Sequence, residues 1–405
     1  MTATRRPKCP PETHPDMHIG AKAVPPARTL PLHVEPLPGE ALDSWLEALA
    51  HRYQVPFRDV LHQCGITCAR PGAWIRLLDR DVLARIAQVT DLDPEDVDAM
   101  ALPRLDRAPP AGANGCLART LPSGPWDWRS NSRYCPHCLD DSVGRWQLAW
   151  RINWTFACPA HQCLLVDACP ACLCAQRTKP HPMTRLPHPG QCCGVRRRDS
   201  SGAPRACGAQ LASAQPVDLR GSPMILQAQH QVMHLLLAEE PIAPRRGQGS
   251  VAALDTLRVL LRWVALTIDY SQLQPQAVLA CCDSEHLNFA APHSGRTAQN
   301  TAAETAASVT TALTILNAHS ITEAAHTWRD LMIAATHGRI RRLSEADQGT
   351  LTPSLRLAYR RAYADANAHH KLRRYFRTSG AKHQSHLAGS AHDDRYRNAE
   401  QCWAR

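Results

Sequence analysis

Ten of the 17 cysteines in this chain of 405 residues lie between Cys135 and Cys207. Five of them, with one histidine, form knuckles in which two ligand residues are separated by two others: Cys135-Pro-His-Cys138, Cys158-Pro-Ala-His161 and Cys169-Pro-Ala-Cys172. Two such pairs separated by about 15–20 residues are the usual source of four ligands for tetrahedral zinc. Nineteen residues separate the first two knuckles. The spacing therefore predicts one Cys3His zinc site.

A second site needs two thiolates in addition to Cys169 and Cys172. Cys207 and one member of the Cys192-Cys193 doublet are available, and the nineteen residues between Cys172 and Cys192 favour Cys192. A cross-braced order, pairing the first knuckle with the third, is the alternative to two sequential sites. Four protein ligands leave no open position for a hydrolytic water, so we expect two structural zinc ions. The predicted ligands are Cys135, Cys138, Cys158, His161, Cys169, Cys172, Cys192 and Cys207.

The N-terminal sequence and the cysteines indicate the cellular compartment of the protein. The N-terminal residues contain prolines and no apolar stretch of the signal-peptide kind, and the most apolar segment, 251–268, carries charges at helical spacing. We therefore expect a cytoplasmic protein without membrane contact. In that reducing compartment clustered cysteines are metal ligands more often than disulfides.

The formal net charge of +10 is divided unevenly along the chain. Residues 129–211 carry +7 and residues 339–405 carry +8, whereas 34–128 carry −5. Two basic blocks around acidic material indicate contact with a polyanion, most often nucleic acid, although a solvated basic surface is the alternative. The candidate nucleic-acid contacts are Arg196, Arg197, Arg198, Arg341, Arg342, Lys371, Arg373 and Arg374.

Hydrophobic periodicity predicts helices on both sides of the cysteine-rich segment. Leu42, Trp45, Leu46 and Leu49 form one helical face, and 82–89 followed by 97–100 indicates two helices joined by a tight turn, as in a helix-turn-helix. Further helices are expected over 223–240, 251–270, 302–317, 321–343 and 355–376. The fold class is therefore mainly α, with helix-turn-helix units flanking a small module with two structural zinc sites. The expected domains are a Pro-rich disordered arm (1–29), an N-terminal helical domain (30–128), the zinc-finger module (129–211), a C-terminal helical domain with basic helices (212–378) and a disordered tail (379–405).

Three tryptophans between the first two knuckles, Trp146, Trp150 and Trp154, are spaced four residues apart. That spacing predicts one stripe along a helix. The stripe either stacks on exposed bases or packs over the zinc sites, and packing is the more common use of such residues.

The order of these motifs resembles the TniQ/TnsD family of transposition proteins. The resemblance rests on Leu30-Pro31 to Pro36-Leu-Pro-Gly-Glu40-Ala-Leu-Asp-Ser44-Trp45-Leu46, on Tyr134-Cys135-Pro-His-Cys138-Leu, on Trp146-Gln-Leu-Ala-Trp150-Arg151, and on the knuckles up to Cys172. It covers residues 30 to about 211. Beyond that point only helical content and basic charge continue.

The resemblance implies a non-catalytic accessory or target-selection factor of DNA transposition. Its partners would be DNA, an AAA+ ATPase of the TniB/TnsC type and, through that ATPase, a DDE transposase; a homodimer with a second copy of the chain is also compatible. Two other functional classes remain open: a transcriptional regulator, and a protein-interaction adaptor, including one that docks to a CRISPR ribonucleoprotein. The sequence contains no Gly-rich phosphate loop, Gly-x-Ser-x-Gly motif or defensible acidic triad, so an enzyme is not expected.

Overall fold

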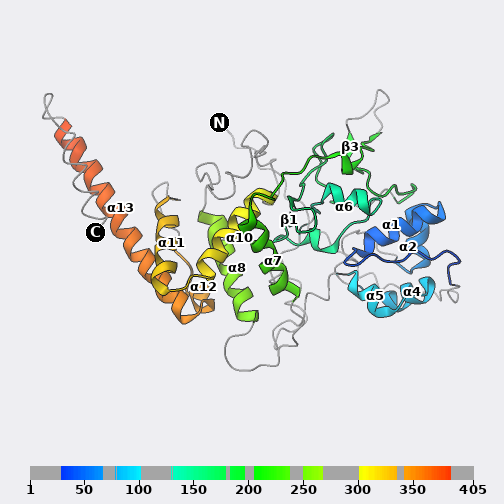
Figure 1. Cartoon of the computed structure of the whole chain (residues 1–405), viewed down its shortest axis with the longest axis horizontal. Helices are drawn as coiled ribbons and strands as arrows, with labels where there is room; N and C mark the ends of the chain where they lie inside the picture. Colours follow the sequence, from blue (N-terminus) through cyan, green and yellow to red (C-terminus); the bar gives the residue numbers. More distant parts are fainter. Residues whose placement is uncertain are drawn as a thin grey trace, which may run out of the picture.

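The computed structural model describes residues 29–66, 78, 80–101, 129, 131–178, 183–196, 205–237, 250–267, 301–334 and 342–384. Within these ranges the chain is mainly helical (Figure 1). Its buried apolar side chains form three hydrophobic cores, one in the N-terminal helices, one around the cysteines and one in the C-terminal helices. The expected arm before residue 29 and the tail after 384 lie outside the described residues. None of the described helices has the length and apolar content that a bilayer crossing requires.

The N-terminal helices pack around the apolar face that the sequence predicted. Leu42, Trp45, Leu46 and Leu49 are all buried. Asp93 begins the last helix of this unit because its side chain accepts a hydrogen bond from the amide of Glu95 at 2.8 Å, a standard N-cap. The helices are α1 (Leu42–Tyr53), α2 (Phe57–Gln63), α4 (Arg80–Thr90) and α5 (Pro94–Ala99).

The described residues of the middle segment form short regular elements. Two antiparallel sheets each consist of two strands of two residues, β1 with β2 and β3 with β4. So few hydrogen bonds between strands do not stabilise a fold by themselves. The segment therefore depends on side-chain interactions for its stability. Its elements are α6 (Pro136–Asp141), η3 (Leu148–Arg151), β1 (Ala157–Cys158), β2 (Cys163–Leu164), β3 (Val195–Arg196), β4 (Arg205–Ala206) and η4 (Leu211–Ser213).

The helical stripe predicted for Trp146, Trp150 and Trp154 is wrong. Only the four residues of η3 are helical there, with 3-10 geometry, and the chain then turns toward β1. All three indoles are buried: Trp146 and Trp150 pack among the cysteines, and Trp154 packs into the C-terminal core. Packing is therefore the role of these residues, and exposed base stacking is excluded.

The C-terminal helices form a core around Trp328. Its ring lies 5.7 Å from that of Trp263 and 5.1 Å from that of Tyr359, so three helices meet at one aromatic cluster. α12 was not expected from the sequence, and α13 is longer at both ends than the predicted 355–376. The helices are α7 (Pro223–Leu237), α8 (Ser250–Thr267), α10 (Ala302–Leu316), α11 (Ile321–Ala334), α12 (Glu345–Thr350) and α13 (Pro353–Gln384).

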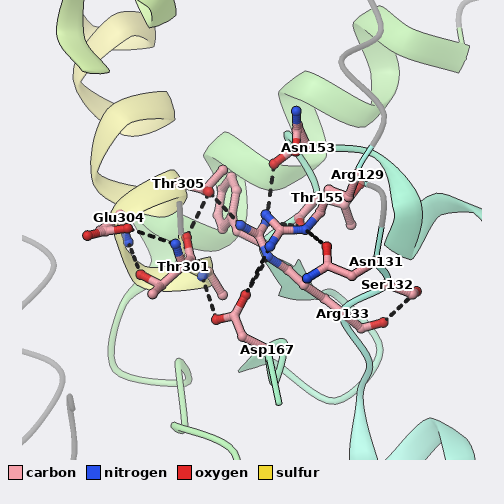
Figure 2. A network of polar contacts seen from close by, with 12 residues as sticks. Arg129, Asn131, Ser132, Arg133, Asn153, Thr155, Asp167, Thr301, Glu304 and Thr305 are labelled. Carbon is pink, nitrogen blue, oxygen red and sulfur yellow. Dashed lines mark hydrogen bonds and ion pairs between the residues drawn. The ribbon is translucent and has the colours of Figure 1, made fainter. Parts of the chain in front are cut away.

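A buried arginine joins the cysteine-rich segment to α10 (Figure 2). Arg133 has no exposed surface, and its guanidinium donates to the carbonyls of Asn153 and Thr155, to Oγ1 of Thr305 and to Oδ1 of Asp167. Oδ2 of Asp167 in turn accepts from the amide of Ala302, the first residue of α10, at 2.8 Å. One ion pair thus connects the middle segment to a helix N-terminus far along the chain.

A second polar contact joins the cysteine-rich segment to the start of α1. The fully buried carboxylate of Glu40 pairs with Arg145 and also accepts from the hydroxyl of Ser44 at 2.8 Å. That hydroxyl accepts from the amide of Trp146 at 2.8 Å. Gly39 supplies the positive φ of 71° that the turn before Glu40 requires. The Pro-Gly-Glu sequence is therefore a docking element for the middle segment.

Two arginines of the middle segment also reach the acidic side of α1. Arg151 and Arg177 both pair with Asp43, and Arg177 pairs with Glu47 at 2.6 Å. Burial opposes ionisation of Asp43, but the two arginines outweigh it and hold the pKa of Asp43 below its usual value. Burial raises the pKa of Glu47 to about 7. The guanidinium of Arg177 also lies 4.6 Å from the centre of the Trp146 ring, a cation–π contact.

Replacing Arg133 with Met tests whether this arginine stabilises the junction with α10. We expect the free energy of unfolding to fall by about 3 kcal/mol, because Asp167, Thr305 and two backbone carbonyls lose a shared donor. Urea unfolding of the full chain measures the change. Arg220→Met is the control: its side chain is 75% exposed and 3.7 Å from Asp218, so a loss below about 0.5 kcal/mol is expected. Equal effects of both substitutions would contradict the assignment.

Candidate metal centres

Four predicted ligands meet in a first cluster beside α6. Cys135, Cys138, Cys158 and His161 place one ligand atom each within 4.8 Å of all the others. The sulfurs of Cys138 and Cys158 are 3.5 Å apart, and Nδ1 of His161 lies 3.2 Å from the Cys138 sulfur. The first knuckle is formed by the N-terminus of α6, and the second lies in the β1–β2 hairpin.

A carboxylate behind His161 completes this cluster. Nε2 of His161 lies 3.0 Å from Oδ2 of Asp141 while Nδ1 faces the three sulfurs. This arrangement of carboxylate, imidazole and metal fixes the ring and the tautomer that ligation needs. Sequence reasoning missed Asp141 because no spacing rule connects a residue at the end of α6 to a histidine in the hairpin.

The other four predicted ligands form a second cluster. Cys169, Cys172, Cys192 and Cys207 again lie with their sulfurs within 4.8 Å of one another. The sulfur of Cys192 is 3.5 Å from that of Cys172, whereas Cys193 lies close to Arg177 and Glu47. The geometry thus favours Cys192 within the doublet, and the two clusters follow the sequential order.

Two glycines allow the second cluster to close. A Cβ on Gly194 would lie 3.1 Å from the Cys172 sulfur and 3.2 Å from the Cys192 sulfur, so any side chain here would crowd the thiols. Gly208 has a positive φ of 65° and its amide donates to the carbonyl of Cys192 at 3.0 Å. The chain after Cys207 therefore turns back onto the cluster, as the Cys-Gly sequence suggests.

The donor sets and their spacing fit zinc. A tetrahedral ion with Zn–S bonds of about 2.3 Å holds its sulfurs about 3.8 Å apart. The measured separations are 3.5 Å for Cys172 and Cys192 and 3.9 Å for Cys169 and Cys207. Backbone amides of Ala171 and Gly194 donate to two of these sulfurs at 3.4 and 3.3 Å, which stabilises thiolates. Cys163, a residue without a predicted role, packs 3.7 Å from the Cys135 sulfur.

The candidate DNA contacts are spread over two regions. Arg196 lies on β3, whereas Arg197, Arg198 and Arg341 are outside the described residues. Arg342 precedes α12 and is exposed. Lys371, Arg373 and Arg374 are exposed on the C-terminal half of α13, which extends away from the other described helices (Figure 1). Three of the eight candidate DNA-contact residues therefore lie on one helix.

Fold and clusters together define a class: a mainly helical protein organised around a module with two Cys/His clusters that can hold metal ions. Residues 31–165, about one third of the chain, match the family model of TniQ. The TniQ domain indicates a transposition-associated protein. No curated protein matches the sequence. The matched segment contains α1 to β2 and the first cluster, and it ends before the second.

The Cys192-Cys193 doublet provides a matched test of the second cluster. Wild-type protein should contain about two zinc ions per chain by mass spectrometry, since each cluster offers four ligands. Cys192→Ser should reduce this to about one, whereas Cys193→Ser, the control, should leave two. One ion in the wild type, or equal loss from both variants, would contradict the second centre.

Proposed function

We propose that this chain is a non-catalytic, DNA-binding accessory factor of transposition that selects or holds target DNA and recruits an AAA+ ATPase, which engages a DDE transposase. The TniQ domain supports the transposition role. We also propose zinc at both clusters, with Cys135, Cys138, Cys158 and His161 at one and Cys169, Cys172, Cys192 and Cys207 at the other. All four positions of each ion would be filled by protein, which leaves a structural role.

The observation that carries the DNA-binding role is the basic surface of α13. Between Arg356 and Tyr375 this helix has six Lys or Arg residues and a single acidic residue, Asp365. Lys371, Arg373 and Arg374 are exposed on the half that extends beyond the core (Figure 1). Long cationic side chains on a projecting helix can reach the phosphates of a duplex without distortion of the protein.

The N-terminal helix pair is less suited to DNA. α4 and α5 are joined by three residues, a connection of helix-turn-helix length, but Glu95 and Asp96 are exposed on α5 and Asp91 and Asp93 are exposed in the turn. Such a surface repels phosphate. We therefore place DNA contact at the C-terminal helices and assign the acidic helices to protein partners, the ATPase first among them.

An adaptor that binds no DNA is the second candidate, and the same acidic surface favours it. Charge reversal at Arg373 and Arg374 would leave such an adaptor functional, whereas Glu95→Lys with Asp96→Lys would abolish partner binding. If the chain is a DNA-binding factor, both pairs of substitutions should impair transposition, the arginine pair through DNA binding and the acidic pair through partner binding.

Salt dependence tests the DNA-binding role directly. Duplex DNA should bind at about 50 mM salt, and affinity should fall steeply as salt rises, because phosphate contact releases counterions. Replacing Lys371, Arg373 and Arg374 with Ala should reduce the slope of log K against log salt by about 3. Replacing Arg58 and Arg220, which are exposed on other elements, is the control and should leave the slope unchanged. Absence of binding at about 50 mM salt would contradict the proposal.

A further inference from the structure

A cleft of about 490 Å³ is lined by residues of α12, the first turns of α13 and Arg342 before them. Its volume is in the range of sites for small ligands. Side chains of three kinds line it, cationic, aromatic and acidic: Arg342, Arg356, Arg360, Tyr359, Tyr363 and Glu345. We propose that this cleft binds one unpaired nucleotide of a DNA strand, phosphate against the arginines and base against Tyr363. This inference rests on the proposed DNA-binding function and gives it a specific site.

Arg356, one of the arginines that line the cleft, is held in place by hydrogen bonds within the protein. Nε of Arg356 donates to the carbonyl of Gln348 at 2.8 Å, and Nη2 donates to those of Gly349 at 3.0 Å and Leu351 at 3.2 Å. These carbonyls end α12, where a cation is favoured. Among the described residues no acceptor is recorded for Nη1, so the guanidinium keeps a donor while its position is fixed.

The other two arginines supply the charge at the rim. Arg342 and Arg360 are exposed, and neither forms an ion pair with a carboxylate of the described part of the chain. With Glu345 as the single acidic lining residue, the cleft carries a formal charge of +2. A concave basic site concentrates anions, and guanidinium groups match the geometry of phosphate oxygens. The positive charge at the rim therefore favours a ligand that carries a phosphate group.

The tyrosines restrict the ligand further. Tyr359 is buried, its ring lies against Trp328, and its hydroxyl accepts from the amide of Leu343 at 2.7 Å, so it forms a fixed wall. Tyr363 is half-buried, with its ring centre 6.0 Å from that of Tyr359. A partly exposed ring beside a phosphate site is suited to stack on a base. Bases within a duplex are already stacked, so the ligand needs an unpaired nucleotide.

The cleft continues into the basic surface of α13. Arg356, Arg360, Tyr363, Lys371 and Arg374 are spaced so that they share one face of the helix. At 1.5 Å per residue the face extends about 27 Å from Arg356 to Arg374. A strand whose unpaired nucleotide enters the cleft can therefore keep its backbone along the same cations, which connects the cleft to the contacts proposed above.

Fluorescence anisotropy with the full chain tests the cleft. The probes are a blunt duplex, the same duplex with a single-stranded overhang, and ATP as a free-nucleotide competitor. We expect the overhang to bind about 5- to 100-fold more tightly than the blunt duplex, the range for stacking one base. Tyr363→Ala should remove this preference, and Tyr363→Phe, which keeps the ring, should retain it. Tyr375→Ala, which changes a tyrosine 65% exposed elsewhere on α13, should leave it intact.

The charge substitutions separate this inference from the general DNA-binding role. Arg342→Ala with Arg360→Ala should weaken overhang binding about tenfold or more at about 100 mM salt, whereas Arg361→Ala on another side of α13 should have a smaller effect. If the cleft variants bind like wild type while the Lys371, Arg373 and Arg374 variant is impaired, the cleft assignment is wrong and DNA binding stands. If ATP binds with the same dependence on these residues and no overhang preference exists, the cleft serves a free nucleotide, and the assignment to a DNA strand is overturned.

Discussion

Ligand convergence at the two Cys/His clusters is the constraint on which the rest of the structure depends. Where it is described, the segment from Cys135 to Cys207 has two-residue strands and short helices, so its backbone hydrogen bonds contribute little stability. Its sulfurs converge at separations that suit a tetrahedral ion. Because metal binding and folding are coupled in such modules, a bound ion would supply the free energy that regular secondary structure supplies elsewhere.

Arginines with largely buried side chains connect the cysteine-rich segment to both helical units. Arg145 and Arg177 reach carboxylates at the start of α1 and within it, and Arg133 reaches the N-terminus of α10 through Asp167. Each guanidinium is costly to bury and is tolerated only with several acceptors in place. These contacts therefore leave the flanking helices few other orientations. The cysteine-rich module thus connects the acidic N-terminal helices to the C-terminal helical unit that contains the basic α13.

The features that depend on the spacing of nearby residues could be predicted from the sequence. The eight side chains that the spacing singled out lie in two groups of four, and the apolar positions of α1 are buried as expected. Interactions between distant residues could not be predicted, because nothing local marks Arg133 as a partner of Thr305, 172 residues away, or Arg145 as a partner of Glu40. The tryptophan stripe failed for a related reason: four-residue spacing suits a helix, but Trp146 and Trp150 are buried among the cysteines and Trp154 in the C-terminal core. Only Trp150 lies in the 3-10 turn.

Hydrogen exchange of the full chain with and without a strong chelator tests most directly whether the clusters organise both flanking units. Removal of metal should increase exchange in the cysteine-rich segment and, together with it, in α1 and in the first turn of α10, because the arginines that hold those helices lose their fixed positions. If α1 and α10 keep their protection while only residues 135–207 exchange faster, the helical units stand independently of the module, and its role as the joint of the structure is contradicted.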